Sequence, residues 1–474
     1  MATPVPITPS GATGGLGLFR ALRSRNYRLF FIGQGISLIG TFLTQIATIW
    51  LVYHITSDER WLGTVAFAGQ IALFFLAPFG GVLVDRWNKR NLLVVTQILS
   101  MLQSLALAAL MLTNVRVWEI VVLAFVQGLI NCFDMPARQA FTVEMVENRE
   151  DLANAIALNS TMVHTARLMG PALGGFLLYK VGPGLCFLID GLSYIAVIVC
   201  LVLMHVQPNR PKARGHSVLH ELHEGIVYAW SSVPIRVLLL LMAVISLTGM
   251  PAFNILMPVF ARALGGLRSD AQTLGLLMAV SGAGALACAV FLASRRTVVG
   301  LGRFIAIAGV TFGAALIAFA FSRQLWLSML IAPVAGFGML ANFASANTLL
   351  QTLADDDKRG RVMSLFTVAF IGVAPFGNLL AGFAARHFGG AIAGASQAVM
   401  VAGLIVIVAA AFWAAMLPNI RKIIRPIYVQ KGIIREVATG LGNAAGPASA
   451  QSEVADGAVV MNREPNGDGE VDDE

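Results

Sequence analysis

The sequence predicts an all-α membrane protein with twelve transmembrane helices arranged as two six-helix halves. Of its 474 residues, 57% are hydrophobic and 12% are charged, whereas soluble chains carry about a quarter charged residues. Charge-free stretches of membrane length recur, such as the 29 residues between Arg28 and Asp58, and about 20 apolar helical residues cross a bilayer core of ~30 Å. Because these stretches do not alternate in polarity as barrel strands do, the spans are expected to be helices.

Hydrophobicity and the spacing of charges divide the chain into five parts. The first six spans fall within residues 29–206 and the last six within 236–418. A cytoplasmic segment, 1–28, precedes them, a linker with a surface helix, 207–235, separates them, and a largely disordered cytoplasmic tail, 419–474, follows. The twelve spans are expected at residues 29–52, 62–84, 92–113, 118–137, 154–179, 185–206, 236–261, 272–294, 303–322, 325–349, 363–385 and 391–417.

The distribution of basic residues predicts the orientation. With both termini in the cytoplasm, 25 of the 33 Lys and Arg residues lie on the cytoplasmic side, seven lie on the outer side, and Arg167 lies within a span. Cytoplasmic loops of membrane proteins carry an excess of Lys and Arg. An even number of spans with cytoplasmic termini is therefore predicted, and the net charge of +8 does not indicate a nucleic-acid partner.

The residue types that enzymes and metal sites need are not assembled in the spans. The four cysteines are scattered among apolar stretches without the spacing of zinc ligands. No Gly-x-x-x-x-Gly-Lys-Ser/Thr loop is found, so ATP hydrolysis is not expected. No Ser–His pair or His/Asp/Glu cluster suggests an intramembrane hydrolase. The sequence therefore predicts a protein that is not an enzyme and needs no metal or cofactor.

A charged motif follows the second span. It contains Gly81, Asp85, Arg86, Lys89 and Arg90. Glycine allows a neighbouring helix to approach closely, the aspartate can meet the positive end of another helix, and the basic residues can bind acidic groups on the facing half. These features suit a gate, although the same basic residues could simply be cytoplasmic anchors of the helices.

This motif resembles the loop signature of the major facilitator superfamily, Gly-x-Leu-x-Asp-Arg-x-Gly-Arg-Arg. Asn88 replaces the second glycine, and asparagine is the residue that next best tolerates a left-handed turn. In the fifth span, a run similar to the antiporter motif of that superfamily contains Gly170, Pro171, Gly174 and Gly175. Its small residues, spaced four apart, form a smooth face for close helix packing, which also occurs in membrane proteins without antiport activity.

A wider resemblance covers residues 19–418. The blocks Asn131–Phe141, Ala166–Pro171 and Phe187–Asp190 in the first half, with Arg359–Ser364 in the second, are similar to the drug and siderophore exporter branch that contains the enterobactin exporter. The resemblance implies a multi-pass monomer of the bacterial inner membrane that exports a small amphipathic molecule, a drug, siderophore or related metabolite, by alternating access in exchange for protons. An uptake permease or facilitator and a non-transporting membrane sensor remain the alternatives.

Polar side chains recur on one face of several spans. In the superfamily, spans 1, 4, 7 and 10 line the central cavity, and the polar residues on these spans fit that role. The alternative is that they hydrogen-bond neighbouring helices. The cavity candidates are Gln34, Thr41, Gln45, Gln127, Asn131, Asn254 and Asn342.

Few ionisable residues lie at membrane depth, and all the acidic ones belong to the first half. Such groups are costly in lipid and are expected to be paired or functional. The candidates for proton coupling or salt bridges are Asp134, Arg138, Arg167 and Asp190. We expect Arg167 and Asp190 to form a structural pair, since both reach comparable depth. Asp134 is expected either to lock the inner gate by pairing with Lys89 or Arg86, or to exchange protons with the cavity.

Overall fold

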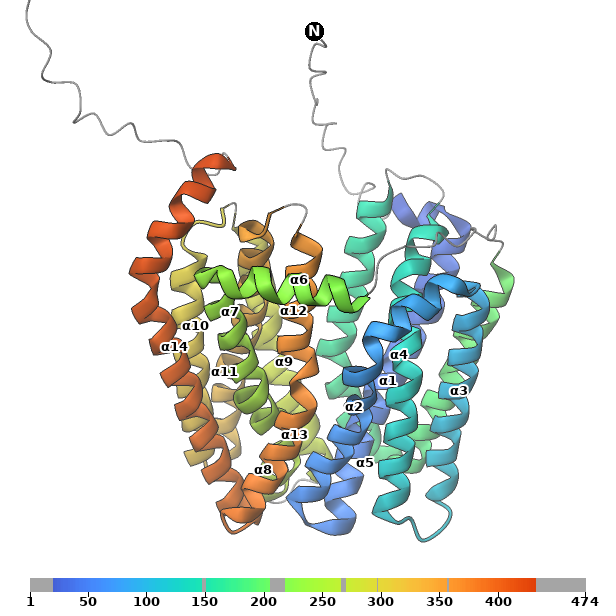
Figure 1. Cartoon of the computed structure of the whole chain (residues 1–474). Coiled ribbons are helices and arrows are strands. Elements are labelled where there is room, and N and C mark those ends of the chain that lie inside the picture. The colour runs from blue at the N-terminus through green and yellow to red at the C-terminus, as the bar shows by residue number, and fades with distance from the viewer. Residues whose placement is uncertain are drawn as a thin grey trace, which may run out of the picture. The chain divides into compact units, whose positions relative to one another are not determined.

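The computed structural model describes residues 20–146, 151–204, 218–265, 270–295, 297–355 and 358–431. Among these residues the regular structure is entirely helical (Figure 1). The first part of the predicted linker and the end of the predicted tail lie outside the described residues. So do the side chains of Gly81, Asp85, Arg86, Arg167 and Pro171, although their backbone is helical. The helical bundle forms one compact unit that ends at Ile427.

The helices follow one another as the hydropathy predicts. The first half consists of η1 (Arg20–Arg23), α1 (Arg25–Thr56), α2 (Glu59–Arg86), α3 (Lys89–Leu110), α4 (Val117–Met145) and α5 (Leu152–Leu203). After α6 (Val218–Ser231), the second half consists of α7 (Val233–Val244), η3 (Ile245–Gly249), α8 (Met250–Leu264), α9 (Asp270–Ser294), α10 (Leu301–Phe321), α11 (Leu325–Leu353), α12 (Arg359–Thr367), η4 (Val368–Gly372), α13 (Ala374–His387) and α14 (Ala391–Gln430).

Within the described part of the chain, ten helical segments are long and apolar enough to cross a membrane. They correspond to ten of the predicted spans. The other two predicted spans, 62–84 and 154–179, are helical in α2 and in the first part of α5 but are not among those ten. The multi-pass helical architecture is therefore confirmed, whereas the count of twelve and the cytoplasmic termini stay predictions.

Local sequence explains how adjacent spans separate. The side chain of Asp58 caps α2 by accepting a hydrogen bond from the backbone N–H of Arg60 (3.0 Å). The long helix α5 bends at Gly182, whose φ of 77° and ψ of 171° lie in a region that glycine adopts without steric strain and other residues rarely adopt. This single residue turns one continuous helical stretch into two spans.

Asn88 differs from expectation. Its φ is −67°, which is not left-handed, and its side-chain oxygen accepts a hydrogen bond from the N–H of Asn91 (3.1 Å). Asparagine is a preferred residue at a helix N-cap. Asn88 therefore begins α3 as a cap, a role that glycine in the superfamily signature lacks the side chain to perform.

Two helices of the second half contain a π-helical turn, at Ile245–Gly249 and at Val368–Gly372. Each turn lies just before a proline, Pro251 or Pro375, that lacks the backbone N–H an α-helix uses. The two turns pack together, and the Ser246 hydroxyl donates a hydrogen bond to the carbonyl of Phe370. The chain thus accommodates both prolines without interrupting either helix.

The helices run between two ends of the bundle (Figure 1). We call the end where α1 begins the proximal end. The distal end, opposite to it, carries the end of α8 and the connections between α1 and α2, α3 and α4, α10 and α11, and α13 and α14. The two halves meet mainly where α2 packs on α13 and α5 packs on α9.

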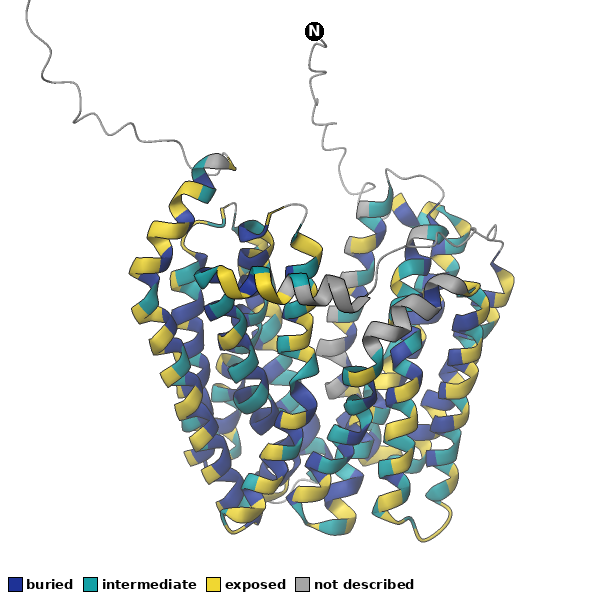
Figure 2. Ribbon diagram, viewed as in Figure 1, coloured by how far each residue is buried: buried dark blue, intermediate teal, exposed yellow. Residues whose placement is uncertain are grey.

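Buried residues line the inside of the helix groups, and exposed residues, many of them large and apolar, lie on the outside (Figure 2). One core cluster of the first half gathers Tyr27 and Phe30 of α1, Phe141 of α4 and Leu201 of α5. Within it the Tyr27 hydroxyl donates a hydrogen bond to the carbonyl of Ala155 (2.7 Å). An apolar exterior is what a lipid-facing surface requires.

Candidate functional site: two buried carboxylates

Asp134 lies on α4 and is 4% exposed. One carboxylate oxygen accepts a hydrogen bond from Gln97 Nε2 (2.7 Å) and lies 2.9 Å from Thr96 Oγ1, both on α3. The other oxygen contacts the guanidinium of Arg138, one helical turn further along α4. Both oxygens are therefore satisfied, and a cation compensates the charge of the buried carboxylate.

The sequence suggests Lys89 or Arg86 as the partner of Asp134. Of these two, Lys89 does not pair with it. Its ammonium instead contacts Glu144 at the end of α4. Arg90 donates hydrogen bonds to the carbonyls of Leu201 (2.7 Å) and Val202 (2.6 Å) at the end of α5. Orphan carbonyls at a helix C-terminus attract cations. In the described structure both basic residues bind within the first half, so they fasten α3 to α4 and α5.

Asp190 lies on the second part of α5 and is 2% exposed. Its Oδ2 accepts a hydrogen bond from Thr44 Oγ1 of α1 (2.7 Å) and lies 2.9 Å from Ser104 Oγ of α3, which also lies 2.9 Å from the carbonyl oxygen of Phe187. Its Oδ1 is buried without a hydrogen-bond partner among the described residues, and α1 approaches it closely at Gly40, where an added Cβ would lie 2.6 Å from that oxygen. Among the described side chains, no basic group bonds the Asp190 carboxylate.

The expected pair between Arg167 and Asp190 stays a prediction, because the Arg167 side chain lies outside the described part of the structure. Sequence reasoning missed the hydroxyl and amide donors of α3. Their spacing offered a signal: α3 carries Thr96, Gln97, Ser100 and Ser104 at helical intervals within an otherwise apolar span, and all four are buried. Thr96 and Gln97 contact Asp134, and Ser104 contacts Asp190.

The small-residue face of α5 packs as its spacing predicts. A Cβ on Gly170 would lie 2.5 Å from Phe42 Cβ, and one on Gly174 would lie 2.9 Å from Ile46 Cδ1, so this face contacts α1. Gly175 instead faces Gly275 of α9, where an added Cβ would lie 2.4 Å from the glycine Cα. The motif therefore brings α5 against both its own half and the other.

The predicted cavity residues differ in exposure. Thr41 and Gln45 are exposed, Gln34 and Asn342 are buried, and the remaining three, Gln127, Asn131 and Asn254, are intermediate. Gln127 donates weakly to Ser100 (3.3 Å) and Asn131 (3.2 Å), so part of the stripe on α4 bonds within its half. That these side chains share one cavity stays a prediction.

The helical architecture is that of a polytopic membrane protein. Residues 17–424 match the family described as transmembrane secretion effector. The chain belongs to this family of the major facilitator superfamily and is a transporter, not an enzyme.

Two similar proteins with established names are also transporters. The chain is 23% identical to the staphyloferrin A transporter of Staphylococcus aureus, over 76% of this chain and 90% of that protein. It is 25% identical to the multidrug efflux pump Tap of Mycolicibacterium fortuitum, over 72% of this chain and 85% of the pump.

Solved structures share the fold. The nucleoside transporter NupG superposes with a TM-score of 0.65 at 13% identity, covering 84% of this chain and 99% of NupG. A bacterial homologue of the human lysosomal transporter Spinster, in an inward-facing and unoccupied conformation, gives 0.67 at 16% identity, covering 87% of this chain and 99% of the homologue.

Proposed function

We propose that this protein exports a small amphipathic organic molecule across a bacterial inner membrane in exchange for protons, as a monomer with both termini in the cytoplasm. Export is favoured because relatives are named for efflux of multiple drugs and of macrolides, and another for staphyloferrin A transport. The proximal end of the bundle is then the cytoplasmic end and the distal end the outer end.

The observation that carries proton exchange is the environment of Asp190. An isolated charge in a membrane interior is costly unless a counter-charge or a proton neutralises it. The described polar partners of the Asp190 carboxylate are the neutral hydroxyls of Thr44 and Ser104. A carboxylate in that setting is suited to carry a proton in one state of the transporter and release it in another.

The position of Asp190 couples it to helix movement. Its donors belong to α1 and α3, and Gly40 of α1 lies against its second oxygen. A shift of α1 relative to α5 would change how much water reaches this oxygen. Alternating access requires such rearrangements between two packed states. We assign to Asp190 the role of proton carrier and to the ion pair of Asp134 and Arg138 a structural role.

The substrate is expected to be amphipathic and of moderate size. The cavity candidates offer amides and a hydroxyl, such as Gln45, Asn254 and Thr41, which can hydrogen-bond a neutral or weakly charged compound. They offer no group of cations that would select a strongly anionic one. Drugs, siderophores and related metabolites all meet this description.

Proton movement in inverted membrane vesicles tests this function. Vesicles with and without the protein are energised until a proton gradient forms, and lipophilic drugs and siderophores are then added one by one. Collapse of the gradient by a compound only where the protein is present would establish antiport and identify the substrate class. If a labelled compound equilibrates through the protein while none disturbs the gradient, the protein is a facilitator. If no labelled compound crosses, the sensor alternative gains.

A further inference from the structure

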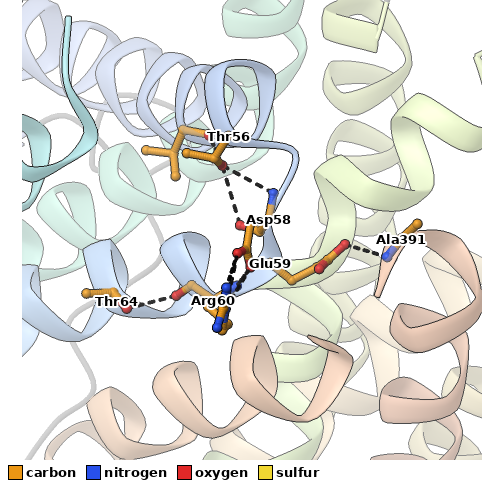
Figure 3. Close-up of polar contacts among 7 residues, drawn as sticks. Thr56, Asp58, Glu59, Arg60, Thr64 and Ala391 are labelled. Atoms are coloured by element: carbon orange, nitrogen blue, oxygen red, sulfur yellow. Dashed lines mark hydrogen bonds and ion pairs between the residues drawn. The ribbon is translucent and has the colours of Figure 1, made fainter. Parts of the chain in front are cut away.

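Glu59, the first residue of α2, is buried at the distal end although it adjoins a loop. Its Oε1 accepts a hydrogen bond from the backbone N–H of Ala391, the first residue of α14 (2.7 Å; Figure 3). The two residues are 332 positions apart in sequence and belong to different halves of the bundle. A carboxylate of the first half therefore caps a helix of the second.

The two residues that flank Glu59 in sequence, Asp58 and Arg60, are engaged with each other. The Arg60 guanidinium donates to both oxygens of Asp58, at 2.7–3.2 Å, on the exposed side of the turn (Figure 3). The second oxygen of Glu59 is buried and has no hydrogen-bond partner among the described residues. The contact with Ala391 is consequently the hydrogen bond that the described structure gives this carboxylate.

The N-terminus of α14 is suited to bind a carboxylate. The first N–H groups of a helix have no partner within the helix and carry the positive end of its dipole. Gly389, Gly390 and Ala391 all have positive φ, 106°, 67° and 47°, and such a φ is unfavourable for alanine. A strained backbone persists where surrounding contacts hold it, and the bond to Glu59 is one such contact.

Close packing surrounds this bond. At Gly63 of α2, an added Cβ would lie 2.5 Å from the carbonyl oxygen of Asn378, and at Gly382 of α13 it would lie 2.5 Å from the carbonyl oxygen of Glu59. Nearby, Arg262 of α8 donates a hydrogen bond to Ser57 Oγ (2.9 Å). Two hydrogen bonds between the halves, this one and that of Glu59, thus lie at the distal end.

We propose that the bond between Glu59 and Ala391 is a latch that holds the distal face of the transporter closed and opens in each transport cycle. This inference rests on the alternating-access part of the proposed function. Opening the distal face would separate α2 from α14 and expose both partners to water, which can replace the lost bond. The latch therefore favours the closed face by a limited amount and stays reversible.

Pulsed electron paramagnetic resonance on the purified full-length protein can test the latch. Spin labels are placed at Asn114 and Ala263, which are exposed at the distal end of the first and second half. The background has the four native cysteines replaced by serine, and its transport is checked first. Because the measurement needs neither a proton gradient nor a substrate, its outcome is independent of whether protons drive export.

Glu59→Ala is expected to raise the ratio of widely separated to closed molecules on the order of tenfold, the effect of losing one hydrogen bond to a charged group. Glu59→Gln retains an acceptor without the charge and is expected to give a smaller rise. If Glu59→Ala does not fold, the distance distribution of Glu59→Gln tests the latch in its place.

Asp58→Asn is the matched control, since it alters the neighbouring carboxylate and keeps a good cap for α2. Its distance distribution is expected to equal that of the parent protein. An unchanged distribution in Glu59→Ala, or an equal shift in Asp58→Asn, would overturn the latch.

Discussion

Asp134 and Asp190 are both buried in the first half of the bundle, yet their described surroundings differ in charge. Asp134 faces the guanidinium of Arg138 and two polar groups of α3, which together satisfy both its oxygens. Asp190 meets two hydroxyls, and its other oxygen has no partner among the described residues. The acidic residue with a cation is suited to hold the structure, and the one that meets hydroxyls is suited to change its protonation.

The two sites also differ in how they are assembled. The ion pair of Asp134 lies on a single helix, one turn apart, so it moves with α4 as a unit. The donors of Asp190 come from α1 and α3 while the carboxylate belongs to α5. Movement between helices could break every described hydrogen bond of the Asp190 side chain, whereas Asp134 would keep its contact with Arg138. Burial alone is therefore a poor guide to function in this membrane protein, and the origin of the partners is a better one.

The largest expected effect is that of Asp190→Asn. The amide keeps the size of the side chain and can still accept from Thr44 and Ser104, but it cannot exchange a proton. Gradient-driven transport in inverted vesicles is expected to fall to the level of vesicles without the protein, at near-normal abundance on an immunoblot. If abundance falls together with transport, the structural pair with Arg167 becomes the better description.

Arg138→Ala tests the other half of the comparison. Removing one partner of a buried ion pair leaves an uncompensated charge, which costs about 3–5 kcal/mol when both partners are fully buried. Because the Arg138 side chain is 26% exposed, about 2 kcal/mol is expected here, seen as a lower melting temperature in detergent. Adding Asp134→Asn should restore much of the loss. No recovery in the double variant would contradict the pairing.

Gly40→Ala is expected to displace Asp190 while leaving its carboxylate group in place. The new methyl group would lie 2.6 Å from Oδ1 and 3.0 Å from the Asp190 Cα, so α1 and α5 must move apart. Overpacking of this kind typically costs about 1–3 kcal/mol. Gly35→Ala on the same helix is the control, since its methyl would lie at an ordinary 3.6 Å from Met162 Sδ. Equal melting temperatures for the two variants would argue against a tight site.

The smallest effect is expected from a carboxylate outside the spans. Hydrogen bonding from the Arg60 side chain lowers the pKa of Asp58 below its ordinary value. A lowered pKa in the folded state means stabilisation that is present at neutral pH and is lost as the pH falls through that pKa. Because Arg60 is solvent-exposed and water screens its charge, Asp58→Asn should cost less stability at pH 7 than any of the variants above. The cost should vanish in strongly acidic buffer, as melting curves at both pH values can show.

Sequence reasoning reached the helices because hydropathy is a local property. The approximate positions of the spans, the packing face formed by Gly170 and Gly174, and the placement of Asp134 and Asp190 within apolar spans can all be read along one helix. The partners did not follow, because they depend on which helices become neighbours. The sequence suggests Lys89 or Arg86 as the partner of Asp134, whereas Lys89 contacts Glu144. Nothing near Glu59 in sequence indicates its bond to Ala391.

The paired π-helical turns at Ile245–Gly249 and Val368–Gly372 have a consequence for chain length. A π-helical turn contains one residue more than an α-helical turn, and each residue rotates a helix by about 100°. Removing one residue from either turn should restore a regular α-helical turn and leave the residues beyond it on nearly the same face, whereas a deletion in a regular stretch rotates every residue beyond it by about 100°. Single-residue deletions should therefore be accepted at these two places more readily than elsewhere in the spans, and homologous chains are expected to differ in length there.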